Sequence, residues 1–416
     1  MKTDYSGIKK IIRDRIREKM DFTRDYSDDE VQDLIDDEIM TSEETEQLSV
    51  PDKRKICNEI FDSLRRLDIL QKYVDDPSVT EIMINGRDRI FVEKNGQLSE
   101  LEECFEDDEK LGDVIQQIVA GCNRAVNEAS PIVDARLANG SRVNVVMNPV
   151  ALNGPIVTIR RFPDKPIDMN RLLELNSLTL EAASFLSDLV KAKYNIFISG
   201  GTGSGKTTFL NVMSGYISQD ERVITIEDSA ELQIQGIRNL VRLETRSRTT
   251  EGAEEISIRD LIRASLRMRP DRVVIGEVRG AEALDMLQAM NTGHDGSMST
   301  GHANSAKDMM SRLENMVLMG ADLPLPAIRQ QIASGLDLIV HLGRLRDRSR
   351  RVQEITEVLG YENGEIRLNP IYEFEEDDYK DGKVIGSLKK KGELQNRNKL
   401  CLAGLSCNPM ERDDAV

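Results

Sequence analysis

The chain has 416 residues, and its 56 Lys and Arg against 73 Asp and Glu give a formal net charge of -17. At about 150 residues per domain, this length predicts two or three domains. The acidic balance argues against a generic nucleic-acid binder, and no run of about 18 apolar residues encodes a membrane-spanning helix. The charged N-terminus shows no secretory signal, and five cysteines without a CxxC pair favour reduced thiols, so we expect a cytoplasmic protein.

Residues 1–75 predict an N-terminal helical bundle. Three apolar stripes recur at helical spacing, and Pro51 falls between the second and the third, where a helix must begin or end. The stripes are Ile8, Ile11, Ile12 and Ile16; Val31, Leu34, Ile35 and Ile39; and Ile56, Ile60, Leu64 and Leu67.

Residues 76–165 predict a smaller α+β domain. Short β-type runs cover residues 80–84, 89–93 and 143–146, Asn-Gly pairs mark turns, and a helical stripe spans residues 111–119. The proline-containing segment 163–166 predicts a linker at the end of this domain.

Residues 166–350 alternate between short apolar runs and helical patterns. The runs at 195–199, 222–227 and 272–276 are rich in β-branched residues. This alternation predicts an α/β fold with a mostly parallel, buried sheet. Hydrophobic content falls over residues 351–416, where we expect a C-terminal tail with one hairpin-like region followed by disorder.

The strongest motif is a glycine-rich loop, GGTGSGKTT, which follows the first of these runs and fits G-x4-G-K-[ST]. Glycines allow successive backbone N–H groups to converge on phosphate oxygens at the start of a helix near Lys206. Lys206 would neutralise phosphate charge, and Thr207 would offer its hydroxyl to Mg²⁺. The predicted nucleotide-binding residues are Gly200, Gly201, Thr202, Gly203, Ser204, Gly205, Lys206, Thr207 and Thr208.

Two of the apolar runs end in acids, Glu227, with Glu231 four residues further on, and Glu277. The carboxyl ends of parallel strands meet where an α/β sheet opens toward its ligand. An acid there can hold a metal-bound water or polarise an attacking water, and the sequence does not separate these roles. A single acid at a strand end can also be a helix cap.

His302 and His294 lie in polar, glycine-flanked segments. Such a position suits a group that senses a terminal phosphate and moves when it leaves. It would also suit a metal ligand, although no third ligand has a suitable spacing. His341, in an apolar run, is expected to be a core or strand-edge histidine.

Together these blocks resemble the secretion ATPases of type II and type IV systems, and in particular the CpaF/TadA-type ATPase of tight-adherence (Tad/Flp) pili. The resemblance covers roughly residues 55–360, with four motifs in the family's order. Gly301 departs from the pattern, since the family more often has an apolar residue there. The matching stretches are GGTGSGKTT, ITIEDSAEL (224–232), residues 263–305, and DARLANGSRVNVV (134–146) with TIRRF.

The resemblance implies a RecA-like P-loop ATPase domain, preceded by a PAS-like α+β domain and the helical bundle. It implies a homo-hexamer that binds ATP and Mg²⁺ between the α+β and RecA-like domains. Hydrolysis would power pilus assembly, with retraction or related protein secretion as alternatives. An integral membrane platform protein would be the partner at the cytoplasmic membrane face, with no nucleic acid expected.

Residue roles follow from the same resemblance. The aspartate-box acids are Glu227, Asp228 and Glu231, the Walker B-like acid is Glu277, and Arg279 and His302 complete the catalytic group. Thr207 and Glu277 would hold the metal. Four arginines would reach the phosphates from the other domain or a neighbouring subunit: Arg136, Arg142, Arg160 and Arg161. For Arg160 and Arg161, a salt bridge at the strand end is the alternative interpretation.

Two other functions are compatible with a P-loop. A RecA-like nucleic-acid-translocating ATPase would find a contact surface in the basic cluster Arg344–Arg351, whose other interpretation is a solvated loop. A P-loop kinase or passive nucleotide switch would need an acceptor site or lid, which the sequence does not suggest.

Overall fold

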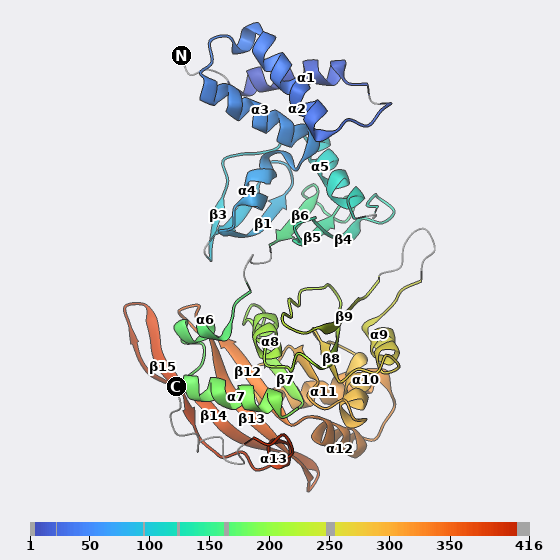
Figure 1. The fold of residues 1–416 in the computed structure, drawn as a ribbon, viewed down its shortest axis with the longest axis vertical. Coiled ribbons are helices and arrows are strands. Elements are labelled where there is room, and N and C mark those ends of the chain that lie inside the picture. The colour runs from blue at the N-terminus through green and yellow to red at the C-terminus, as the bar shows by residue number, and fades with distance from the viewer. Residues whose placement is uncertain are drawn as a thin grey trace. The chain divides into compact units, whose positions relative to one another are not determined.

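A computed structural model describes residues 5–21, 23–94, 96–122, 125–161, 166–246 and 254–405. The chain forms two compact units, Met1–Asp164 and Lys165–Val416, here called the N-terminal and C-terminal units (Figure 1). The boundary between them falls within the segment predicted as a linker, of which residues 163–165 lie outside the described residues. The finer division into four parts stays a prediction.

The three predicted helices at the N-terminus are confirmed. Their apolar stripes pack against one another, while Ile11 is largely exposed. Ser27 and Glu30 form a capping box at the start of the second helix, and Pro51 lies in the first turn of the third, where its missing N–H costs nothing. The helical elements before the first strand are α1 (Tyr5–Lys19), α2 (Asp28–Thr41), η1 (Glu43–Thr45), α3 (Val50–Arg65), η2 (Asp68–Leu70) and α4 (Gln71–Asp75).

The rest of the N-terminal unit is an antiparallel sheet of six strands in the order β3-β2-β1-β6-β5-β4, packed against helix α5 (Asp108–Ala120). The three predicted β-type runs correspond to β1, β2 and β5, so the α+β character is confirmed. The strands are β1 (Val79–Asn85), β2 (Ile90–Lys94), β3 (Gln97–Glu100), β4 (Ile132–Arg136), β5 (Arg142–Val146) and β6 (Ile156–Arg160).

The C-terminal unit contains a sheet of nine strands in the order β15-β14-β13-β12-β7-β11-β10-β8-β9. The six strands from β12 to β9 run parallel, as predicted, and β13 to β15 extend one side of the sheet antiparallel. The strands are β7 (Ile196–Gly200), β8 (Arg222–Glu227), β9 (Asn239–Glu244), β10 (Arg272–Ile275), β11 (Met298–Gly301), β12 (Leu338–Arg344), β13 (Arg350–Glu362), β14 (Glu365–Lys380) and β15 (Lys383–Lys390).

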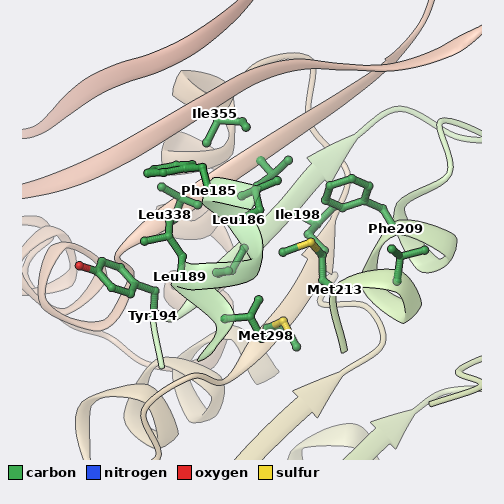
Figure 2. Close-up of a cluster of buried hydrophobic side chains, with 14 of the residues drawn as sticks. Phe185, Leu186, Leu189, Tyr194, Ile198, Phe209, Met213, Met298, Leu338 and Ile355 are labelled. Atoms are coloured by element: carbon green, nitrogen blue, oxygen red, sulfur yellow. The ribbon is translucent and has the colours of Figure 1, made fainter. Parts of the chain in front are cut away.

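Helices cover both faces of the parallel strands. In β7, Ile196 and Ile198 pack with α7 and α8, whereas Phe197 points to the opposite core beneath α9 to α12. Figure 2 shows Phe185 of α7 in the first of these cores, beside side chains from several strands. Burial on both faces explains why these strands are continuously apolar in sequence. The helices are α6 (Met169–Glu174), α7 (Leu180–Lys191), α8 (Lys206–Ser214), α9 (Ile258–Ser265), α10 (Glu282–Asn291), α11 (Ala306–Gly320), α12 (Leu325–Gly335) and α13 (Asn398–Leu402).

The expectation of a largely disordered tail is wrong over residues 351–405. The charges that suggested disorder lie on adjacent strands and pair across them, as Glu375 does with Lys389 at 3.0 Å. The buried carboxylate of Glu357 accepts backbone N–H groups of Gln395 and Asn396, which fixes the segment before α13.

Two further observations bear on the expectations from composition. Cys401 is disulfide-bonded, which corrects the expectation of reduced thiols throughout, whereas the cysteines at 57, 104 and 122 are free. Within the described residues, no helix combines the length and the hydropathy needed to cross a bilayer.

Candidate nucleotide-binding site

The glycine-rich loop joins the central strand β7 to helix α8, which begins at Lys206. Gly205 precedes the helix with a φ of 95°, a left-handed conformation that favours glycine. A Cβ at Gly200 would lie 2.4 Å from the carbonyl oxygen of Leu342 in β12, so the close approach of the neighbouring strand also requires glycine. The loop therefore has the geometry that directs N–H groups toward an anion at the start of α8.

Lys206 is buried beside this loop. Its ammonium donates a hydrogen bond to the carbonyl of Gly201 (3.1 Å) and lies 3.4 Å from Nδ1 of His302. Burial lowers the pKa of Lys206, and the nearby carboxylate of Glu277 opposes that change. The cation is thus held in a partly desolvated position, where its attraction to phosphate is stronger than in water.

Glu277 follows β10 and lies at the same edge of the sheet. Arg279 Nη2 donates to its Oε2 (2.8 Å), and Nε2 of His302 lies 2.9 Å from its Oε1. Burial favours the protonated form, but the hydrogen bond from Arg279 and the surrounding positive charges hold the pKa of Glu277 below its usual range. The side chain is therefore ionised at neutral pH.

Glu227 ends β8 and is almost completely buried. Its Oε1 accepts the backbone N–H groups of Glu231 and Leu232, both at 2.7 Å, while its Oε2 has no hydrogen-bond partner in the described part of the chain. Burial raises the pKa of Glu227 to about 7, despite these two N–H donors. A Cβ on Gly276 would lie 3.0 Å from Glu227 Cγ, so the side chain packs against the residue before Glu277.

The other two aspartate-box acids take different positions. Glu231 contributes its backbone N–H to Glu227, as described above, whereas Asp228 is exposed and accepts the hydroxyl of Thr245 (2.9 Å). Arg279 Nη1 lies 3.9 Å from Asp228 Oδ2, which connects the aspartate box to the arginine that binds Glu277.

His302 lies between the P-loop lysine and the strand-end acid. Its pKa is lowered by burial and by the Lys206 charge, so its imidazole is neutral at neutral pH. It follows Gly301, the position at which the chain departs from the family pattern. A Cβ at Gly301 would lie 2.9 Å from the ring of Phe197, so this packing has no room for a larger side chain.

The structure separates the other two histidines from this group. His294 precedes β11 while His302 follows it, so they lie at opposite ends of that strand. His341 is buried in β12, and its Nδ1 lies 2.9 Å from the hydroxyl of Ser199. The core interpretation of His341 is confirmed.

Three of the four predicted arginines form a row in the N-terminal unit. Arg136 pairs directly with Arg142 across β4 and β5, and Arg142 pairs with Arg160 across β5 and β6. Glu81 of β1 continues the row opposite Arg160, and Arg161 lies one residue beyond β6. Like charges directly opposite each other destabilise a sheet, and the ion pair between Arg142 and Asp134 of β4 (3.5 Å) offsets part of that repulsion.

The site residues fit a nucleoside triphosphate with Mg²⁺. Glu227 Oε2 is a buried carboxylate oxygen without a hydrogen bond in the described structure, and Glu277 Oε1, also buried, lies 2.9 Å from Nε2 of His302 without an aligned hydrogen bond. A metal or an ordered water would satisfy these oxygens. Thr207, in the first turn of α8, and Glu277 are the residues that would hold Mg²⁺. No cluster of three potential metal-ligating side chains occurs among the described residues, and Mg²⁺ commonly binds one or two protein ligands plus phosphates and waters.

One contact at the loop was missed by the sequence reasoning. Arg350 Nε, from the start of β13, donates to the carbonyl of Gly203 (2.9 Å). The two residues are 147 positions apart, and only the pairing of β12 with both β7 and β13 brings them together. The sequence marked Arg350 only as part of the basic cluster Arg344–Arg351, and no local pattern could have placed it at the P-loop.

Comparison with known proteins identifies the family of this chain. The family model described as "Type II/IV secretion system protein" matches residues 64–380. The chain belongs to this family. It is 31% identical to the conjugal transfer protein TrbB of Rhizobium radiobacter, over 78% of this chain and 97% of TrbB. It is also 31% identical to the type IV secretion system protein PtlH of Bordetella pertussis, over 70% of this chain and 93% of PtlH.

Among solved structures, the chain is similar to the pilus retraction motor PilT with bound ADP. The TM-score is 0.52 at 19% sequence identity, and the match covers 82% of this chain and 86% of that one. At this identity the likeness supports the fold alone. The predicted α/β, RecA-like architecture is thereby confirmed. The family match confirms the resemblance to type II/IV secretion proteins, while the CpaF/TadA-type subtype stays a prediction.

Proposed function

We propose that this secretion-family protein is a Mg²⁺-dependent ATPase that powers assembly of a Tad/Flp-type pilus. It would act as a homo-hexamer at the cytoplasmic face of the membrane, docked on an integral membrane platform protein. The observation that carries the proposal is the continuous set of contacts from Lys206, after β7, through His302, after β11, to Glu277, after β10. Membership of the type II/IV secretion family supports the role in transport.

The contacts assign a task to each side chain. The P-loop N–H groups and Lys206 bind phosphate oxygens, and ionised Glu277 orients and polarises the attacking water. Mg²⁺, when bound, neutralises charge on the phosphates. Neutral His302 lies within contact distance of both Lys206 and Glu277. When the terminal phosphate leaves, the positions of Lys206 and Glu277 would change, and His302 would respond to both changes.

The arginine row supports a mechanical role. Charge that develops on the transferred phosphoryl group needs positive partners, and an arginine supplied from another domain or subunit can raise the rate by several orders of magnitude. Arg136, Arg142 and Arg160 offer three guanidinium groups on one face of a separate unit. Movement of that unit toward and away from a nucleotide would couple hydrolysis to the shape of the ring.

The decisive experiment replaces Glu277 by Gln, which keeps the size of the side chain and removes its charge. We expect phosphate release to fall at least about 100-fold, a typical loss for a group that acts in the transition state, while ADP binding persists. Glu376→Gln, on an exposed part of β14, is the matched control and should hydrolyse ATP normally. Normal hydrolysis by Glu277→Gln would refute the catalytic assignment.

The cellular role needs its own test. In a strain carrying Lys206→Ala, imaging should show no surface filaments, because the motor cannot bind nucleotide productively. Full-length filaments in that strain would contradict the pilus role while leaving the ATPase assignment intact.

A further inference from the structure

The turn between β12 and β13 lies beside the P-loop. Leu342 of β12 pairs with Gly200 at the end of β7, and Arg344 pairs with Arg350 where β13 begins. The arginine-rich segment 344–351, which the sequence left as either a nucleic-acid contact or a solvated loop, therefore flanks the proposed nucleotide site.

Two arginines of this segment have structural partners away from the P-loop, in β14, in β15 and in the turn after α6. Arg351 is buried and donates to the backbone carbonyls of Asn176 (3.0 Å) and Val384 (3.2 Å). Arg346 forms an ion pair with Glu376. These contacts hold the sheet extension in place, so the segment is not a uniform basic surface offered to nucleic acid.

Arg350 is directed to the P-loop instead. Its Nε donates to the carbonyl of Gly203 (2.9 Å), and its Cδ would be 3.6 Å from a Cβ at Gly205. Its own carbonyl accepts the Ser177 hydroxyl (3.0 Å), which fixes the backbone from which the side chain extends. Successive residues of a strand point to opposite faces of the sheet. Arg350 can therefore contact the P-loop while its neighbour Arg351 contacts the β14–β15 extension.

A charged donor on this carbonyl should affect the nucleotide. The P-loop binds phosphates through its N–H groups, so a hydrogen bond to one of its carbonyls holds the loop without occupying a phosphate-binding donor. Hydrogen bonds to charged groups are stronger than neutral ones, and a hydrogen bond at one side of a peptide group polarises the other side.

We infer that Arg350 is a positioning residue for the nucleotide: it fixes the P-loop through Gly203, raises nucleotide affinity, and ties the β13–β15 extension to the phosphate site. This inference rests on the proposed nucleotide binding at the P-loop. Arg350 does not need to contact the reacting atoms, so its effect belongs to binding and not to the chemical step.

The test compares Arg350→Met with Arg344→Met in the full-length protein. The two arginines are cross-strand neighbours, both are exposed, and both substitutions remove one positive charge. We expect Arg350→Met to raise the Kd for a fluorescent ADP analogue and the KM for ATP about five- to tenfold, the loss typical of one hydrogen bond at an exposed side chain, with kcat within about twofold. Arg344→Met should change each value by less than about twofold.

Three further measurements make the outcome decisive. Without nucleotide, the two variants should melt within about 2 °C of each other, and ADP should raise the Tm less for Arg350→Met. Arg350→Lys, which retains a charged donor, should recover most of the affinity, and it serves as the test if Arg350→Met does not fold. Equal ADP affinities for Arg350→Met and Arg344→Met, with binding abolished by Lys206→Ala, would overturn this inference alone. Normal ADP binding by Lys206→Ala would instead overturn the proposed function.

Discussion

Strand β10 begins at a buried arginine and leads to a half-buried glutamate, and the surroundings of these two charged residues differ. Arg272, at its start, has no exposed surface and forms a two-point ion pair with Glu221 (2.7 and 2.8 Å) plus a hydrogen bond to the carbonyl of Val190 (2.8 Å). Glu277, just beyond its end, shares one oxygen with Arg279 while its other oxygen makes no hydrogen bond in the described structure.

The comparison separates two uses of charge around one short strand: Arg272 stabilises the fold, whereas Glu277 is available for the proposed chemistry. The guanidinium of Arg272 is packed so closely that a neighbouring residue must be glycine, because a Cβ on Gly296 would lie 2.5 Å from it. At the Glu277 end, acceptors are left unsatisfied beside a lysine and a neutral histidine. A buried polar group without a partner costs stability, so the unpaired oxygens of Glu227 and Glu277 suit a place where a ligand binds.

The largest expected effect tests the structural end. Arg272→Met should lower the free energy of unfolding by about 3–5 kcal/mol, because the largely buried Glu221 carboxylate loses its two-point ion pair and keeps only Lys193 (3.3 Å). Denaturant unfolding of the purified protein measures this loss. Combining Arg272→Met with Glu221→Leu should recover much of it, and a loss below about 1 kcal/mol for the single variant would show that the ion pair is not structural.

A smaller effect, which depends on pH, is expected at Glu227. Its pKa is raised to about 7 in the folded protein from a usual value of 4.5, so the folded state keeps a proton that the unfolded state has lost. This contribution to stability is complete below pH 4.5 and is lost as pH rises through 7. The unfolding free energy of the wild type should thus fall by up to about 3 kcal/mol relative to Glu227→Gln over that range.

Unfolding is measured for both proteins at matched pH values without nucleotide or Mg²⁺. Glutamine retains an oxygen that can accept the N–H groups of Glu231 and Leu232, so the variant isolates the titrating proton. A constant difference between the two proteins from pH 4.5 to 8 would contradict the raised pKa of Glu227.

The next prediction compares the two histidines that flank β11, His294 before the strand and His302 after it. His302→Ala should lower kcat about tenfold or more, equivalent to about 1.4 kcal/mol, because the imidazole that contacts both Lys206 and Glu277 is lost. Steady-state hydrolysis provides the readout. His294→Ala, at the other end of the strand, should hydrolyse ATP at the wild-type rate, and equal losses in both variants would contradict the assigned role of His302.

The smallest effect is expected on the sheet extension. Arg346→Ala removes the exposed ion pair with Glu376 and should cost less than about 1 kcal/mol of stability, since solvent screens such pairs. The same denaturant measurement applies. A loss above 2 kcal/mol would show that β14 and β15 depend on this arginine more than its exposure suggests.

The sequence by itself determined the local features of this protein. The apolar stripes specify α1 to α3, the continuous apolar runs specify parallel strands, and GGTGSGKTT specifies a turn into a helix. Each depends on residues within one or two turns or a single strand, where periodicity and glycine geometry act directly. The positions of Glu227 and Glu277 at strand ends could also be predicted, because strand ends in an α/β sheet share one edge.

Only the tertiary structure decided what lies between these features. Strand order and register place Arg136, Arg142 and Arg160 in one row, bring Arg350 to the P-loop, and convert a charged tail into three strands. These outcomes depend on pairings between residues far apart in the chain, which no local pattern records. Burial then sets the protonation of Glu227, because its pKa depends on how completely the surrounding fold excludes water.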